Sequence, residues 1–274
     1  MTSGEIALIG AAAVVLAAVI GAFATLMGRR PVSLFGKRSR LVATARYHWQ
    51  EQSIMWALPT QLSSEGRALI ERSNPFHPTD YSAIESWLAK EGGVKINTLI
   101  EGTDAQSEFS PVQLVIQGGA RAPVVIREMR ARIVSRHSPI SSTLVYGPPQ
   151  GEGAVTEIAF DLDSSDAVAR RVNETGLPAA PYFTGTFLTL QPGESMAFSI
   201  RAYTQAFYSE WDIEISAVVN AKAESLIVRD SGGHPFRTTA FSKSYETVYD
   251  LDFQKNRFVL LPPDADPPWD GTLP

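Results

Sequence analysis

The sequence predicts a mainly β protein with an N-terminal transmembrane helix. Three observations support this fold class: an uncharged apolar run near the N-terminus, strand-like alternation of apolar and polar residues from about residue 94 onward, and clusters of turn-forming residues between the alternating segments. We expect an antiparallel β-sandwich of immunoglobulin-like or jelly-roll type over residues 93–261, preceded by a small helical region.

Residues 6–27 contain neither a charged side chain nor a proline. At 1.5 Å per residue such a helix is about 33 Å long, enough to cross the hydrocarbon core of a bilayer. Residues 1–28 are therefore predicted to be a membrane anchor. A cleaved signal peptide is the alternative, because Ala22-Phe23-Ala24 resembles a cleavage site. The uncleaved signal-anchor is favoured because the first five residues carry no Lys or Arg and the apolar run is long.

The charges beside this span predict its orientation, since cationic side chains stay on the cytoplasmic side. Five cations lie in the juxtamembrane linker, residues 29–40: Arg29, Arg30, Lys37, Arg38 and Arg40. The N-terminus is thus expected outside the cell membrane and the body in the cytoplasm.

Ala13, Ala17 and Gly21 fall four residues apart, a pattern that lets two helices approach closely. These three residues are candidates for self-association of the chain into a homo-oligomer.

Residues 41–92 are predicted to be helical. Val42, Ala45, Trp49 and Trp56 recur at nearly helical spacing, and further helices are expected over residues 64–72 and from Thr79 to Glu91. The stripe that also includes Met55 would pack on the adjoining domain or, less favoured, lie at the membrane interface.

Alternation with a period of two marks four of the expected strands, because every second side chain of a strand faces the same side. The apolar sets are Val112, Leu114 and Ile116; Phe198, Ile200 and Ala202; Trp211, Ile213, Ile215 and Ala217; and Tyr245, Thr247, Tyr249, Leu251 and Phe253. In residues 124–135 the apolar face changes parity, which predicts a β-bulge near Arg127 or Glu128.

Residues 262–274 hold five prolines and are predicted to be an extended acidic tail.

Composition narrows the function classes. The chain has 274 residues, a formal net charge of −5 and no cysteine. These values argue against a nucleic-acid binder and exclude disulfides, thiolate metal sites and a cysteine nucleophile. No cofactor motif and no paired histidine ligands are evident, so neither a cofactor nor a metal is predicted.

Two short segments suggest chemistry. Residues 230–233, Asp-Ser-Gly-Gly, resemble the nucleophile segment of chymotrypsin-like serine proteases, a resemblance of four residues that implies Ser231 as nucleophile with His137 and Asp161 or Asp163 upstream. A glycine-containing turn is the favoured interpretation. Asp161, Asp163 and Asp166 could hold Ca²⁺ on a loop, although a solvated loop is favoured.

Arg130, Arg132 and Arg136 share strand parity and form the one candidate partner-binding stripe, for an acidic partner or phosphate; ordinary protection of a sheet surface is the alternative. The function expected is a single-pass membrane protein whose cytoplasmic β-sandwich binds a protein partner without catalysis. An extracytoplasmic ligand-binding or adhesion domain and, less favoured, a hydrolase are the alternatives.

Overall fold

The computed structural model describes residues 41–48, 54–101, 105–119, 122–147, 157–263 and 265. The chain divides into two units, Met1–Arg38 and Ser39–Pro274, and the fold concerns the second. The predicted span, its small-residue stripe, the basic linker, Trp49 and nearly all of the tail lie outside the described residues. Within the described ranges, no helix is long and apolar enough to cross a membrane.

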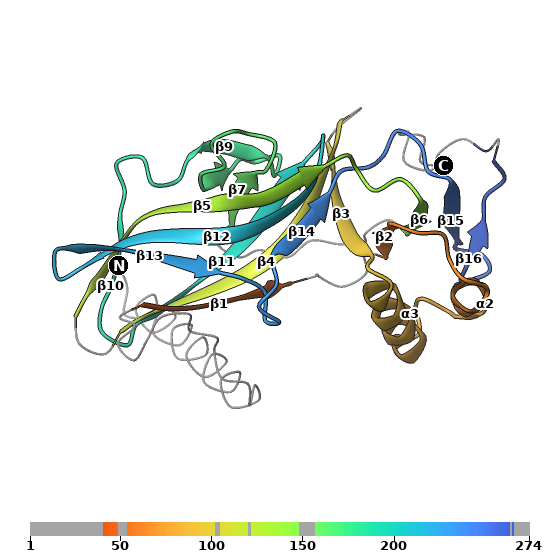
Figure 1. The fold of residues 1–274 in the computed structure, drawn as a ribbon, viewed down its shortest axis with the longest axis horizontal. Coiled ribbons are helices and arrows are strands. Elements are labelled where there is room, and N and C mark those ends of the chain that lie inside the picture. The colour runs from red at the N-terminus through yellow and green to blue at the C-terminus, as the bar shows by residue number, and fades with distance from the viewer. Residues whose placement is uncertain are drawn as a thin grey trace, which may run out of the picture. The chain divides into compact units, whose positions relative to one another are not determined.

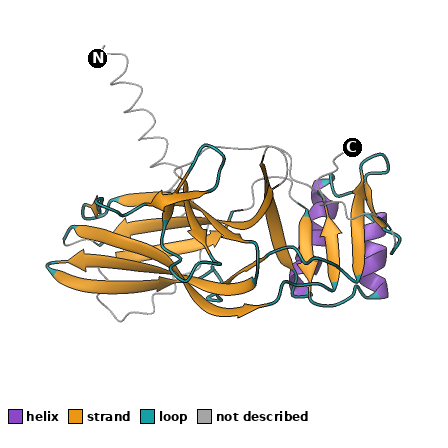
Figure 2. Ribbon diagram, turned by 90° about the horizontal axis from the view of Figure 1, so that it is seen from above, coloured by secondary structure: helices purple, strands orange, loops and turns teal. Residues whose placement is uncertain are grey.

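The second unit is mainly β, as predicted, and its strands form a large and a small sheet (Figures 1 and 2). The large sheet runs in the order β16 (Arg257–Leu260), β15 (Thr247–Asp252), β6 (Thr143–Tyr146), β2 (Met55–Leu58), β3 (Val94–Glu101), β4 (Ala105–Gly118), β11 (Ser195–Thr204), β7 (Glu157–Asp161), β8 (Arg170–Val172) and β9 (Pro178–Pro181), with β1 (Leu41–Tyr47) beside β4. The small sheet runs in the order β10 (Leu188–Leu190), β5 (Val124–His137), β12 (Tyr208–Val219) and β13 (Lys222–Val228), with β14 (Phe236–Thr239) also on β12. Most pairs are antiparallel, but β7 pairs with β11 and β6 with β15 in parallel.

The main core lies between the small sheet and the part of the large sheet formed by β1, β4, β11 and β7. The alternating sets predicted on β4, β11 and β12 all face this core and are almost fully buried. Burial of a whole large apolar side chain stabilises a fold by about 1.5–3 kcal/mol, so these sets contribute substantially to stability. The predicted alternation is confirmed for all three strands.

One edge of the sandwich is closed by the chain that leads into β8. The Ala131 amide donates to the Ala167 carbonyl, and the Ala169 amide donates to the Met129 carbonyl, so this segment hydrogen-bonds to β5 of the small sheet. The next residues, β8, pair with β7 of the large sheet. Backbone groups that an open edge would leave unpaired are thus satisfied on this side.

A second hydrophobic core surrounds the short strands β2, β6, β15 and β16. Helices α2 (Ser64–Arg72) and α3 (Pro78–Lys90) cover one face of these strands. Residues Phe241, Tyr245 and Val248 pack on the other face, against Met55 and Leu144. Strands β2 and β6 are therefore buried on both sides, and the two predicted helices are confirmed.

The prediction of a helix over residues 41–58 is wrong for the described part of this range, because Leu41–Tyr47 form β1 and Met55–Leu58 form β2. In β1 the core-facing residues Leu41, Ala43 and Ala45 alternate with residues on the other face, of which only Thr44 is exposed. Three of its seven residues are small alanines or threonine that give no clear periodicity. Met55 and Trp56 are buried in the protein, which excludes Met55 and Trp56 from a membrane-interface stripe in this structure.

Arg237 on β14 connects the two cores. Its guanidinium donates to the carbonyls of Gly92 and Gly93, at 3.1 and 3.2 Å, in the turn between α3 and β3. Its backbone carbonyl accepts from the hydroxyls of Tyr47 and Ser110, both at 3.1 Å. Arg237 thus forms hydrogen bonds with β1, with β4 and with the turn after α3, none of which is near it in sequence.

Gly66 in α2 touches the ring of Trp87 in α3, and a Cβ there would lie 2.0 Å from the nearest ring atom. We expect Gly66→Ala to lower the free energy of unfolding by about 1–3 kcal/mol through overpacking, despite the better helix propensity of Ala. Chemical denaturation followed by circular dichroism measures this. Glu65→Ala, one residue away and exposed, is the control; equal stability of the two variants would contradict the close contact.

Candidate functional site

The outer face of the small sheet carries an ordered row of charges. The Asp212 carboxylate on β12 is fully buried between two guanidinium groups, Arg132 on β5 and Arg229 beyond β13. Arg229 Nε lies 3.0 Å from Asp212 Oδ1, and Arg132 donates to Oδ2. Both guanidinium groups donate to this carboxylate, so both arginines are occupied by it.

The predicted arginine stripe is divided between two faces of the sheet. Arg130 faces outward and pairs with Glu128. Arg136 pairs in register with Ser209, on the inward side of β12, and its guanidinium donates to the carbonyls of Leu162 and Ser164.

The reason for this division is a bulge at Val134, between the register pairs Trp211↔Ile133 and Glu210↔Ser135. One extra residue reverses the parity of every later position. The interpretation that all three arginines share a face is therefore wrong for Arg136, and binding of a partner by Arg130 and Arg132 stays a prediction.

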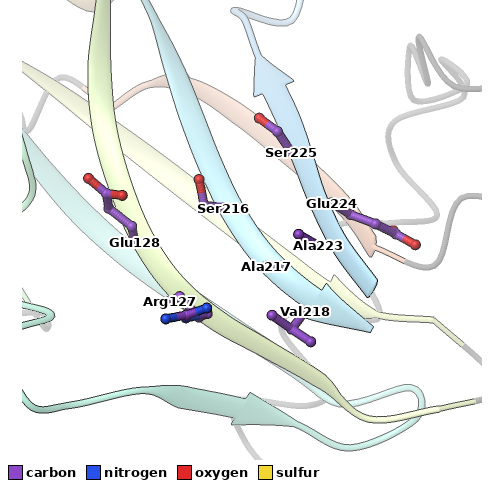
Figure 3. A pocket seen from close by; sticks show the side chains of 8 residues that line it. All are labelled: Arg127, Glu128, Ser216, Ala217, Val218, Ala223, Glu224 and Ser225. Atoms are coloured by element: carbon purple, nitrogen blue, oxygen red, sulfur yellow. The ribbon is translucent and has the colours of Figure 1, made fainter. Parts of the chain in front are cut away.

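The predicted bulge near Arg127 is confirmed, because Ile126 and Glu128 pair with the adjacent residues Ala217 and Ser216. A hollow of about 440 Å³ lies beside it on the outer face (Figure 3). Arg127 and Glu128 line one side, Glu224 and Ser225 line the other, and Ser216 and Val218 of β12 lie between them. Small side chains on the central strands leave this space open.

Two further titratable groups are buried away from this hollow. Lys95 on β3 lies between the rings of Trp56 and Tyr81, and its ammonium donates to Tyr81 Oη at 2.6 Å and to the Glu85 carboxylate. Burial lowers the pKa of Lys95, whereas the hydrogen bond and charge of Glu85 act in the opposite direction. This ion pair fastens α3 to β3, which is a structural role.

Glu108 on β4 is 6% exposed, and burial raises the pKa of its carboxyl to about 7, with a smaller contribution from the charge of Asp163. Asp163 itself accepts from Thr204 Oγ1 at 2.7 Å and from the Gln205 amide at 2.6 Å. Asp161 accepts from the amides of Asp163 and Ser164. Two of the three carboxylates considered for calcium, Asp161 and Asp163, thus accept hydrogen bonds from their own surroundings. The described residues include no group of three ligands suited to a metal.

Residues 230–233 form a turn after β13. Asp230 Oδ1 accepts from the amides of Gly232 and His234, both at 2.8 Å, and Gly233 has a φ of 81°, which favours glycine. His137 stacks on Tyr208, with ring centroids 6.0 Å apart. These contacts explain the Ser-Gly-Gly string by loop geometry and support the turn interpretation.

Two exposed aromatic features were not identified from sequence as sites. Phe76, before α3, and Phe253, after β15, are 44% and 49% exposed, with ring centroids 6.0 Å apart. Phe187, directly before β10, is 65% exposed. Phe253 continues the alternation of β15, so only the position of the strand end, which places it in a turn, distinguishes it from a core residue.

Comparison with known proteins gives no relative for this chain: no protein-family model, no curated protein and no solved structure matches it.

Proposed function

We propose that this chain is a single-pass membrane protein whose cytoplasmic body binds a protein partner. The exposed pair of Phe76 and Phe253 is the observation that supports the binding role, because paired aromatic side chains on a surface are typical of interaction sites. Leu260 is also exposed, on β16, the terminal strand of the large sheet. An edge strand beside apolar side chains offers both backbone pairing and apolar contact.

The membrane anchor in this proposal rests on the sequence of residues 6–27 and the five cations after them. The finer fold class, an immunoglobulin-like or jelly-roll sandwich, is part of the same proposal. So are self-association through Ala13, Ala17 and Gly21 and a partner for Arg130 and Arg132.

The absence of cysteine from the sequence allows a direct test of orientation, since an introduced cysteine is the only thiol. We expect Ser3→Cys to react with a membrane-impermeant maleimide on intact cells, and Gln254→Cys to react only after permeabilisation. The opposite pattern would place the body outside and would support the ligand-binding or adhesion alternative. Labelling of both on intact cells would contradict a single span.

The partner is tested with a photo-crosslinking residue at Phe253 in the full chain. A discrete adduct is expected, which Phe76→Ser should abolish. The same crosslinker at Glu174, exposed in the turn between β8 and β9, is the matched control. Equal adducts from both positions, or none from Phe253, would contradict a binding role for the aromatic pair.

A further inference from the structure

The outer face of the small sheet has a charged half and a half with a row of uncharged residues, beside which Arg127 and Glu128 lie. The charged half contains Asp212 with its two partners, Arg132 and Arg229, and also Arg130. The other half contains a cross-strand row without charge: Thr189, Val125, Val218 and Ala223, joined by the register pairs Thr189↔Val125, Val218↔Val125 and Val218↔Ala223. Phe187 precedes β10 at the side of this half, and the hollow beside Arg127 lies within it.

This half lies at the end of the sandwich where the chain enters it. Leu41, the first residue of β1, pairs with Gly118, the last residue of β4. The Gly118 amide donates to the Glu194 carbonyl, and β5 begins a few residues later, at Val124. Val124 pairs with both Leu190 and Val219. The start of β1 and the row of uncharged residues on the outer face therefore belong to the same end of the sandwich (Figure 1).

The tether to the proposed anchor is short. Only residues 28–40 separate the end of the proposed span from Leu41, at most about 43 Å of extended chain. A linker of this length allows the same end of the sandwich to reach the bilayer surface. At the other extreme of the strands, α2, α3, β15 and β16 are farther from the start of β1 (Figure 1).

The charges of the hollow indicate which lipid would fit. Arg127 is exposed, and its guanidinium has no hydrogen-bond or ion-pair partner among the described residues. Glu128 uses only Oε1 to accept from Arg130, which leaves Oε2 for another donor. A guanidinium binds phosphate well, and a carboxylate accepts hydrogen bonds from a primary ammonium.

We propose that this hollow binds the headgroup of a zwitterionic, ethanolamine-type phospholipid of the bilayer that holds the anchor, an inference that rests on the proposed membrane anchor. Arg127 contacts the phosphate, Glu128 Oε2 accepts from the ammonium, and Phe187 lies against the glycerol and upper acyl region. A quaternary choline group would instead favour a cage of aromatic rings, whereas the eight residues that line this hollow include no aromatic side chain.

The test uses the full chain with a single cysteine at Phe187→Cys, labelled with a fluorophore that a spin-labelled lipid quenches. The chain is reconstituted into vesicles of phosphatidylcholine alone, with phosphatidylethanolamine, or with phosphatidylglycerol. We expect strong quenching only with phosphatidylethanolamine. Phe253→Cys, an equally large exposed side chain at the far end, should stay unquenched in all three.

Arg127→Gln in the labelled chain should weaken the lipid contact about tenfold, the loss expected for one charge-assisted hydrogen bond. Lys243→Gln, another exposed cation, should leave the contact unchanged. Equal quenching in the three vesicles, strongest quenching with anionic phosphatidylglycerol, or no effect of Arg127→Gln would overturn the headgroup site.

Flotation of the same vesicles after an alkaline wash separates this inference from the proposed function. A chain that floats, with position 187 no more quenched than position 253, contradicts the headgroup site and leaves the anchor standing. A chain that is lost from the vesicles contradicts the anchor, and the headgroup site with it.

Discussion

Trp211→Ala is expected to lower the free energy of unfolding by about 3–5 kcal/mol, the range for removing a large aromatic side chain from a packed core. Trp211 on β12 is fully buried and packs against Phe236 and Phe160, with ring centroids 4.9 and 5.9 Å away. Its Nε1 donates to Thr238 Oγ1 at 3.0 Å. The substitution thus leaves a cavity where both sheets meet and an unpaired hydroxyl on β14.

Urea unfolding of the full chain, followed by far-ultraviolet circular dichroism, measures this loss. Trp211→Phe keeps much of the ring and removes the indole N–H, so its loss should fall between those of the wild type and Trp211→Ala. The slope of the unfolding free energy against urea should stay unchanged. A loss below about 1 kcal/mol for Trp211→Ala would mean that the two sheets do not depend on this contact.

The sequence predicts those parts of the fold that local periodicity determines. Val112, Leu114 and Ile116 alternate with polar residues, and each is fully buried on β4. The same local rule correctly predicts the helix over residues 64–72, which begins where the Ser63 side chain accepts from the Gly66 amide. The bulge at Arg127 can also be predicted from the sequence, because apolar residues lie on both sides of the change in parity.

Non-local pairing could not be predicted in this way. The helices belong with strands close to the C-terminus, since Leu88 of α3 shares a core with Tyr249 and Phe258. The hydrogen bonds from the Arg237 guanidinium go to the carbonyls of Gly92 and Gly93, which are far from it in sequence. The bulge at Val134 breaks no apolar pattern, because the residues after it are polar on both faces. Parity counting therefore placed Arg136 on the wrong face.

The candidate site shows the same limit. The charge of Arg127 is visible in the sequence, but that no described residue pairs with it follows only from where Glu128, Arg130 and Glu214 lie after folding. Arg130 and Arg132, which the sequence suggests for binding, are already paired with Glu128 and Asp212. Exposed aromatic side chains are also a property of the tertiary structure, since the sequence pattern of Phe253 is that of a core residue.

Glu108→Gln is expected to stabilise the protein at neutral and alkaline pH. The pKa of Glu108 is raised from 4.5 to about 7 by burial. Between these two values the folded state holds a proton that the unfolded state has lost, so the free energy of unfolding falls as the pH rises from about 4.5 through 7. Above pH 7 the accumulated cost is about 3 kcal/mol, and near pH 4 it vanishes because both states are protonated.

A neutral amide of the same shape removes this dependence. The variant should match the wild type at pH 4 and exceed its free energy of unfolding by up to about 3 kcal/mol at pH 8, measured by urea unfolding at each pH. Glu174→Gln, at an exposed turn, is the control and should follow the wild type at both values. Parallel pH profiles for the wild type and Glu108→Gln would show that Glu108 is charged in the folded protein, and that the region around β4 and the Asp163 loop is open to water.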